Sequence, residues 1–372
     1  MNTTTSTTTG AALDGFTHTT GPARIVFGRG SLAQVPEEVK RAGVRRALVL
    51  TSPEQAEQGA ELASSLGDLA AGVFTNATMH TPVAVTAQAV TALRETNADG
   101  VVALGGGSTT GLGKAIASRT GVPQVVVPTT YAGSEVTPVL GETEHGVKTT
   151  RSGLEILPEV VIYDPSLTDT LPAALTVTSG LNAMAHALEG LYARDGSPVF
   201  AVLATEGLRA FRDALPALHR DPSDQHARDA ALYGAWLCGT VLGGVGMSVH
   251  HKLCHTLGGS LDLPHAPTHA ILLPHTIAFV AEAAAPQLAP ARDLFGTPLG
   301  ATLHDFTTAI GAPQRLSDLG VAEADLDRVA DLALTSAYWT PRPLDRQNIR
   351  ALLQDAWAGH RPGSLASPVG TP

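Results

Sequence analysis

Short apolar runs alternate with helical segments through the first half of the chain, and this alternation restricts the fold more than any other feature. The runs typical of buried strands are residues 24–28, 46–52, 72–74, 99–104, 124–128 and 160–165. Helical segments are expected between them, at 32–42, after Pro53, at 83–96 and at 109–119. Because strands joined through helices run parallel, we predict a doubly wound α/β domain over residues 19–170.

From Pro172 onward the chain carries only helical patterns. The expected helices cover residues 178–190, 199–215, 225–242, 247–257, 274–285, 302–310, 323–334 and 345–357. We therefore predict a second, all-helical domain over residues 171–360. The Thr-rich start, residues 1–18, and the end rich in proline, glycine and serine, residues 361–372, are expected to be disordered.

Charge, hydropathy and cysteine content exclude several classes of partner. The formal net charge is −10 and no basic stripe is present, so we expect no nucleic-acid partner. No apolar run is long enough to span a membrane, and the first residues lack the basic and apolar regions of a secretion signal, so we expect no membrane partner. The two cysteines, Cys238 and Cys254, provide no disulfide framework. These features predict a cytoplasmic protein.

A turn with three glycines, Gly105 to Gly107, lies between a predicted strand and a predicted helix and is followed by Ser108. Without Cβ atoms the backbone can approach an anion closely, and the amides at the helix start point towards it. The turn therefore predicts a site for the pyrophosphate of a dinucleotide. A tight structural turn without a ligand is the alternative, because the spacing differs from G-x-G-x-x-G.

Hydroxyl groups follow the next predicted strand, at Thr129 and Thr130. Dinucleotides bind at the carboxyl edge of a parallel sheet, where this loop and the glycine turn are expected to meet. Lys148 is a second candidate for contact with the cofactor, although a solvated lysine is an equally good interpretation.

Five histidines and Lys252 fall between residues 250 and 269 of an otherwise acidic chain. His251 and His255 are four residues apart, so a helix would place both rings on one face. We expect Gly258 and Gly259 to end this helix and His265 to return from a loop. Such a set is typical of metal sites and proton-handling sites. One buried histidine is usually a satisfied core residue, but five beside a lysine are harder to explain by packing.

Further polar side chains are candidates for contact with a ligand. Asn182 and His186 share a face of an Ala-rich helix. Tyr338 and Arg342 lie in a proline-containing segment and could close over a carboxylate, although a simple turn between helices is at least as good an interpretation of Arg342. Cys254 could be read as a nucleophile beside His255, but we expect it to pack on the buried side of its helix.

Taken together, the glycine turn with Ser108, the Pro128–Thr130 segment, the Asn182/His186 helix and the later histidines resemble the iron-containing (group III) alcohol dehydrogenase superfamily. The resemblance covers about residues 20–358. It implies a Rossmann-like domain followed by a helical domain, as in dehydroquinate synthase-like folds, with a cleft between them and commonly a homodimer. Segments 129–135, 179–186 and 250–259 resemble the members that reduce an unsaturated keto dicarboxylate with NADH or NADPH during the breakdown of aromatic compounds.

The resemblance also implies roles for single positions. The superfamily's metal carboxylate falls on Asn182, and its metal histidines fall on His186, His251 and His265. His255 matches a histidine beside the reacting carbon. The cofactor's phosphate and ribose contacts fall on Gly106, Gly107, Ser108, Thr129 and Thr130.

Three positions depart from the superfamily pattern. Asn182 replaces an aspartate, and a neutral amide binds a divalent ion less well than a carboxylate. We therefore expect no metal, although His186, His251 and His265 would be the ligands if one were bound. Gly111 stands where an acidic residue is usual. Ser52 replaces an aspartate that repels a 2′-phosphate, so we predict that both NADH and NADPH are used.

The implied reaction adds a hydride to the alkene carbon beta to a ketone, which leaves negative charge on the ketone oxygen. We expect His251 and His265 to stabilise that oxygen and His255 to supply the proton. Lys252, His186 and Tyr338 are candidates for binding two carboxylates, and Asn182 for a neutral hydrogen bond. The alternatives are a metal-dependent alcohol or aldehyde dehydrogenase of the same superfamily, and a non-redox cyclase, lyase or nucleotide-binding regulator.

Overall fold

The computed structural model describes residue 18 and residues 24–144, 147–335 and 338–363. Its main sheet has six parallel strands in the order β1, β8, β5, β4, β2, β3. Their bounds are Arg24–Phe27 for β1, Ala47–Leu50 for β2, Ala70–Phe74 for β3, Gly100–Gly105 for β4, Gln124–Pro128 for β5 and Val160–Tyr163 for β8. Every strand that the apolar runs predicted is present, so the parallel α/β fold is confirmed.

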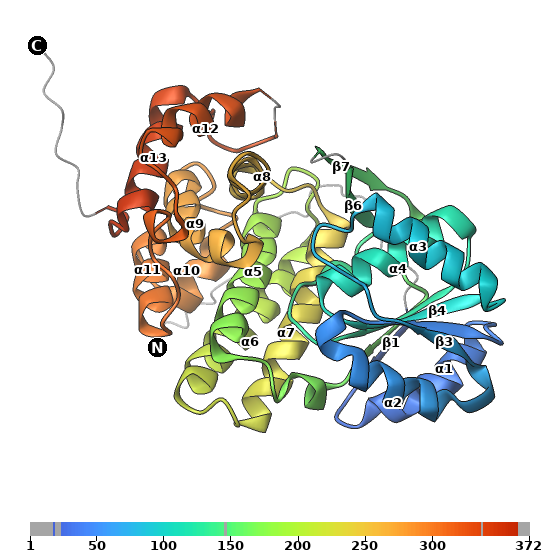
Figure 1. Ribbon diagram of the computed structural model, residues 1–372. Helices are drawn as coiled ribbons and strands as arrows, with labels where there is room; N and C mark the ends of the chain where they lie inside the picture. Colours follow the sequence, from blue (N-terminus) through green and yellow to red (C-terminus); the bar gives the residue numbers. More distant parts are fainter. Residues whose placement is uncertain (1–17, 19–23, 145–146, 336–337, 364–372) are drawn as a thin grey trace, which may run out of the picture.

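Helices cover both faces of this sheet (Figure 1). They are α1 (Val35–Arg41), α2 (Ala56–Leu66), α3 (Val83–Glu95) and α4 (Gly107–Thr120). Alternate residues of one strand serve the two faces: Val49 packs into a core with α1 and α2, whereas Leu48 and Leu50 pack into a core with α3 and α4. Because both faces are buried, the inner strands β2, β4, β5 and β8 are almost entirely apolar instead of alternating with polar residues.

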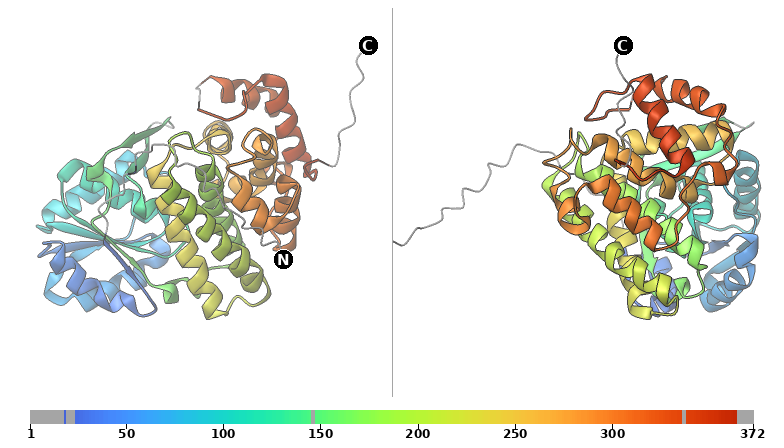
Figure 2. Two further views of the ribbon diagram at one scale, coloured as in Figure 1. Left: turned by 180° about the vertical axis from the view of Figure 1, so that it is seen from behind. Right: turned by 90° about the vertical axis from the view of Figure 1, so that its left-hand side faces the viewer.

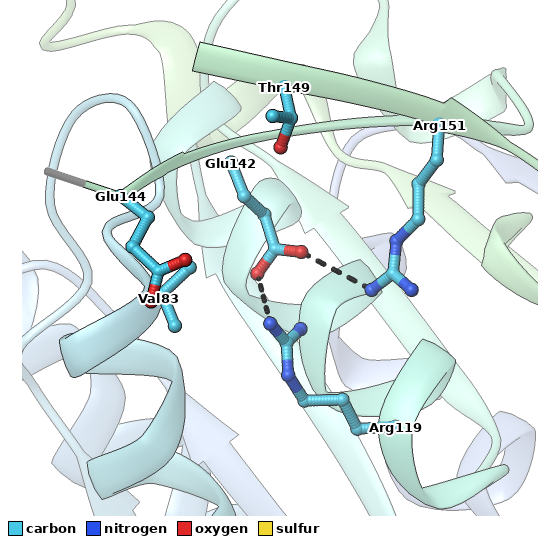
Figure 3. Close-up of a pocket in the computed structure, with 6 residues that line it drawn as sticks. All are labelled: Val83, Arg119, Glu142, Glu144, Thr149 and Arg151. Atoms are coloured by element: carbon cyan, nitrogen blue, oxygen red, sulfur yellow. Dashed lines mark hydrogen bonds and ion pairs between the residues drawn. The ribbon is translucent and has the colours of Figure 1, made fainter. Parts of the chain in front are cut away.

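A two-stranded antiparallel hairpin, which the sequence did not predict, follows the fifth strand. It pairs β6 (Val139–Glu144) with β7 (Val147–Ser152). A hollow between this hairpin, α3 and α4 is lined by Val83, Arg119, Glu142, Glu144, Thr149 and Arg151 (Figure 3). The Glu142 carboxylate pairs there with Arg119 at 2.8 Å and with Arg151 at 3.2 Å.

The second half of the chain is helical, as predicted. Its helices are α5 (Ala173–Leu191), α6 (Pro198–Arg220), α7 (Gln225–Gly244), α8 (Val249–Leu261), α9 (His265–Val280), α10 (Ala289–Phe295), α11 (Leu299–Ala309), α12 (Asp325–Leu334) and α13 (Arg346–Ala358). Figure 2 shows α12 and α13 on the side of the helical half that is farthest from the sheet. The short helix α10 lies in a segment where we expected none.

The expected end of α8 is wrong. The helix continues through Gly258 and Gly259 and ends at Leu261, followed by Asp262, which adopts a left-handed conformation with φ 53°. His265 therefore does not lie in a returning loop but is the first residue of α9. Packing explains the difference, because Leu257 and Leu263, on either side of the glycines, are both buried in the core of the helical half. This burial outweighs the modest helix-breaking tendency of glycine.

A continuous core joins the two halves. Every residue of α5 from Thr176 to Leu191 is buried, so this helix is enclosed on all sides. The same core includes Tyr131, Val161 and Tyr163 from the sheet half. The domain boundary between residues 170 and 171 stays a prediction, as does the disorder of the two tails, which lie largely outside the described residues.

Within the described part of the chain, no single helix is both long and apolar enough to cross a membrane. Helices α7 and α8 together pass that test on length and composition alone, but they are bent by 92° where they meet.

Candidate active site

The glycine turn lies at the carboxyl end of β4, where α4 begins. A Cβ on Gly106 would lie 3.0 Å from Cγ2 of Thr130, and the amide of Thr129 donates to the carbonyl of Gly105 at 3.0 Å. The two loops predicted to meet therefore do meet. No side chain caps the start of α4, so its first amides have no side-chain partner. Backbone amides at a helix start of this kind are suited to binding an anion such as a phosphate.

Ser52 precedes a 3-10 turn, Pro53–Gln55, directly after β2. The turn adjoins the cofactor loops, since the Gln55 amide donates to the Thr129 hydroxyl at 3.3 Å. A hydrogen bond from Ser52 holds the pKa of the exposed Glu54 carboxyl below its ordinary value. A negative charge thus remains close to the position where the superfamily aspartate is missing. The side chain of Lys148 lies outside the described residues, so its contact with the cofactor stays a prediction.

Six imidazole rings gather where α5, α8 and α9 meet, within the described residues. Neighbouring ring centroids are 5.1 Å apart for His186 and His251, 5.9 Å for His251 and His255, and 6.4 Å for His255 and His265. His250 and His269, which we had assigned no role, complete the cluster, with centroids 4.8 Å apart. The cluster unites every histidine that the sequence singled out.

Glu189 on α5 is the main site residue that the sequence analysis missed. This buried carboxylate lies 2.7 Å from Nδ1 of His251 and accepts the backbone amides of Ser248 and His250 at 2.9 and 2.7 Å. Burial raises its pKa, but the hydrogen bond from His251 and the charges of nearby histidines outweigh burial and lower it overall. The spacing along α5 is helical, with four residues from Asn182 to His186 and three from His186 to Glu189. This spacing could have identified Glu189 as a site residue.

A hydrogen-bond chain fixes the ring nitrogens of the inner histidines. The Thr276 hydroxyl donates to the Leu272 carbonyl at 3.0 Å, so it accepts from Nδ1 of His250 at 2.9 Å. Nε2 of His250 must then accept from Nδ1 of His269, also at 2.9 Å. Burial lowers the pKa of His250 to about 3, which agrees with a neutral ring. Nε2 of His269 is thereby left with a lone pair.

Cys254 is buried beside these hydrogen-bonded histidines, as expected, and its sulfur lies 3.6 Å from Nε2 of His250. Burial raises the pKa of its thiol well above the ordinary value, which makes it a poor nucleophile. His250, Cys254 and His269 offer metal-ligand atoms within 4.8 Å of one another. Their nitrogens already bond to each other, however, so a metal there would have to break that hydrogen bond.

Several buried polar atoms of the cluster have no partner in the described structure. They are Oδ1 of Asn182, Nδ1 of His186 and Nε2 of His251 and His269. The first three belong to the superfamily's metal-binding positions. Their lone pairs fit a divalent ion, although the donor set is neutral where the superfamily supplies a carboxylate.

The outer side of the cluster is exposed at His255 and His265. The Tyr338 hydroxyl lies 3.4 Å from Nδ1 of His255, and the Lys252 ammonium lies 5.5 Å from the centre of the Tyr338 ring. The Ser248 hydroxyl fixes this segment by donating to the Trp339 carbonyl at 2.8 Å. His255, the largely buried Lys252 and Tyr338 thus lie together in one polar group that suits a carboxylate.

Arg342 does not reach this surface. Its guanidinium donates to the Phe279 carbonyl at 3.1 Å and lies 4.3 Å from the centre of the Phe279 ring. The interpretation as a turn between helices is the correct one for this residue.

The cofactor turn and the histidine cluster meet through the segment that follows β5. A Cβ on Gly133 would lie 3.5 Å from Nδ1 of His186. The amide of Tyr131 donates to the Ser179 hydroxyl at 3.1 Å, which ties the same segment to α5. A dinucleotide at the glycine turn is therefore connected to the imidazoles by a few residues of backbone.

This architecture belongs to a known class of dehydrogenases. Residues 22–165 match the family model of iron-containing alcohol dehydrogenase, and residues 176–357 match that of the Fe-containing alcohol dehydrogenase family, C-terminal. The chain therefore belongs to the iron-containing alcohol dehydrogenase family, as the resemblance predicted.

Within this family, the chain is 62% identical to the maleylacetate reductase of Rhizobium sp. (strain MTP-10005), over 93% of this chain and 99% of that protein. It is 48% identical to maleylacetate reductase 1 of Cupriavidus pinatubonensis, over 91% and 96% of the two chains. The crystal structure of maleylacetate reductase from Agrobacterium tumefaciens matches with a TM-score of 0.92, covering 94% and 100% of the chains at 62% identity.

Proposed function

We propose that this chain is a maleylacetate reductase, which uses NADH or NADPH to reduce the conjugated C=C bond of 2-maleylacetate to give 3-oxoadipate in aromatic-compound degradation. The observation that carries the proposal is that the loop after β5 approaches both sites: a Cβ on Gly106 of the glycine turn would lie 3.0 Å from Thr130, and a Cβ on Gly133 would lie 3.5 Å from Nδ1 of His186. The identity of 62% to the Rhizobium reductase supports the choice of substrate.

The substrate is a dianion with a ketone conjugated to the alkene. Hydride from the nicotinamide adds to the carbon beta to the ketone, and the alkene electrons move to the ketone oxygen as an enolate. An imidazolium at His251 can donate from Nε2 to that oxygen while the Glu189 carboxylate, 2.7 Å from Nδ1, compensates its charge. His265, near the outer end of the cluster, is the second proposed donor.

Protonation of the carbon alpha to the ketone completes the reaction. The enolate collapses to the ketone as this carbon takes a proton, so one hydride and one proton have been added across the double bond. We assign the proton to His255, whose exposed ring can be reprotonated from solvent and lies beside the Tyr338 hydroxyl.

The two carboxylates of the substrate need positive or donating groups. Lys252 and Tyr338 lie together on the outer side of the cluster and suit one carboxylate. His186 and Asn182, on the inner side, suit the other end of the substrate or its neutral hydrogen bonds. Burial lowers the pKa of Lys252 below its ordinary value.

A divalent ion, when bound, would be held by His186, His251 and His265 with the amide oxygen of Asn182, and it would polarise the ketone as a Lewis acid. The neutral donor set gives this chain a weaker site than a carboxylate would. The unpartnered lone pairs of Asn182, His186 and His251 are the observation that keeps a metal-dependent alcohol dehydrogenase as the second candidate.

We also propose that the protein works as a homodimer in the cytoplasm. The buried free thiols Cys238 and Cys254 agree with a reducing compartment.

Loss of NADH absorbance after addition of maleylacetate tests the proposal, with and without a chelator. We expect stoichiometric oxidation that the chelator does not change. Activity that disappears with the chelator and returns with zinc or iron would favour the metal-dependent alternative. Absence of oxidation with maleylacetate under both conditions would refute the proposed substrate.

A further inference from the structure

A lysine ammonium is buried beneath the cofactor turn. Lys114 belongs to α4, the helix that begins at the glycine turn, and its side chain has no exposed surface. Its Nζ lies within hydrogen-bond distance of the carbonyls of Ser134, Thr137 and Val139 and of the hydroxyls of Ser134 and Thr137. The distances are 2.8 Å to the Thr137 carbonyl and 2.9 Å to both the Thr137 hydroxyl and the Val139 carbonyl.

This environment resembles the one that proteins give a monovalent cation. An ammonium has only three N–H donors, yet five oxygens surround it. Three of the five are backbone carbonyls, the ligands that replace water around potassium in selective sites. Burial lowers the pKa of Lys114 to about 7, and the charge interaction with Glu135, buried close by, works against that shift.

The segment that Lys114 holds is the one that joins the cofactor turn to the histidine cluster. We call residues 129–139 the strap. At its start, the Thr129 amide donates to Gly105 at 3.0 Å. In its middle, a Cβ on Gly133 would lie 2.9 Å from Cα of Gly239 on α7 and 3.5 Å from His186. Its end wraps around the Lys114 ammonium.

Close packing leaves the strap little freedom while the ammonium is present. A Cβ on Gly239 would lie 2.7 Å from Cα of Gly133, and a Cβ on Gly243 would lie 2.6 Å from the Val136 carbonyl. The strap is therefore pressed against α7 on one side. On the other side, the polar contacts of Lys114 hold it to α4.

We propose that Lys114 is a positioning residue whose ammonium acts as a built-in monovalent cation and fixes the strap between the cofactor turn and the histidine cluster. Its effect on turnover rests on the proposed function, whereas its effect on cofactor binding does not. Without the ammonium, three carbonyls and two hydroxyls lose a buried donor, and the strap no longer has a fixed distance to His186.

Chemical rescue tests this proposal in Lys114→Ala, where propylammonium can occupy the space of the missing side chain. We expect the dissociation constant for NADH to rise about tenfold in the variant and to return towards the wild-type value with propylammonium. The thermal midpoint should rise with propylammonium but not with 1-propanol, which has a similar size and no charge. Arg228→Ala, which removes another fully buried cation, is the matched control and should gain nothing from propylammonium.

Lys114→Met provides a second variant if the alanine variant does not fold, because methionine fills most of the same volume without a charge. We expect weaker NADH binding and a lower kcat per folded molecule. The proposal would be overturned if Lys114→Met had the same NADH affinity and kcat as wild type. It would also be overturned if Lys114→Ala responded equally to propylammonium and to 1-propanol. The NADH dissociation constants of Lys114→Ala and Lys114→Met are measured without maleylacetate. Both results can therefore be interpreted even if maleylacetate is not the substrate.

Discussion

The cofactor turn and the histidine cluster are built in opposite ways. The turn depends on the absence of side chains, because a Cβ on Gly106 would lie only 3.0 Å from Cγ2 of Thr130. The cluster depends on side chains that orient one another, such as Glu189 on His251 and Thr276 on His250. Changes at the turn should therefore alter cofactor binding, whereas changes in the cluster should alter the chemical step.

The largest effect is expected from His251→Asn. The asparagine amide can still donate to Glu189, but the group corresponding to Nε2 is gone. Loss of one donor to a developing oxyanion costs about two to three decades in rate, so kcat should fall by that amount while NADH affinity stays constant. Stopped-flow measurement of NADH oxidation and titration of NADH binding check the two halves of this expectation.

His304→Asn is the control for this variant, because His304 lies outside the cluster and its ring is 6.3 Å from that of His275. An equal loss of kcat in both variants would remove the distinction between the cluster and other histidines.

Gly106→Val should produce the opposite pattern. The valine side chain would collide with Thr130 and occupy the approach to the first amides of α4. We expect KM for NADH to rise about tenfold or more, with a smaller change in kcat. Gly259→Ala is the control, because a Cβ there meets nothing within 4 Å. A normal KM in Gly106→Val would show that the cofactor does not use this turn.

Ser52→Asp tests the choice between the two cofactors. A carboxylate at this position should repel a 2′-phosphate, so kcat/KM for NADPH should fall about tenfold while the value for NADH changes little. Glu54→Gln is the complementary variant and should improve NADPH use, because it removes the charge that hydrogen-bonds to Ser52. Parallel steady-state assays with both cofactors measure the ratio; an unchanged ratio in both variants would place the ribose elsewhere.

The smallest effect concerns acid stability outside the site. Burial, followed by the charges of His304 and His360, lowers the pKa of His275 from 6.5 to about 3. Between these values the unfolded chain binds a proton that the folded chain does not, so stability falls as the pH is lowered. In His275→Gln this slope should be shallower by about 1.4 kcal/mol per pH unit. Urea unfolding of both proteins from pH 7 to 4 measures it, and equal slopes would contradict the assignment.

Local sequence signals were enough for the sheet half and for the glycine turn. Strand, glycine turn and helix follow one another within residues 100–120, so no distant partner is needed to recognise them. The β6–β7 hairpin escaped prediction because Lys148 to Ser152 are all polar and give no apolar strand pattern. The end of α8 was misjudged because burial of Leu257 and Leu263 outweighs the two glycines.

The histidine cluster was only partly predictable for a related reason. The rings themselves lie close in sequence, but the groups that orient them do not. Glu189 lies 62 residues before His251, and Thr276 lies 26 residues after His250. In an Ala-rich helix a single glutamate looks like a solvated residue, and only the packing of α5 between other helices shows that it is buried. The roles assigned to single site residues stay predictions.

The central claim is that Glu189 holds His251 in position to stabilise negative charge on the substrate oxygen. Pre-steady-state NADH oxidation by Glu189→Gln at saturating maleylacetate tests it most directly, with circular dichroism to confirm folding. The account predicts a rate about a hundredfold lower than wild type at an unchanged dissociation constant for NADH. A rate within a factor of about two of wild type would contradict it, because the charge of the buried carboxylate would then contribute nothing to the transition state.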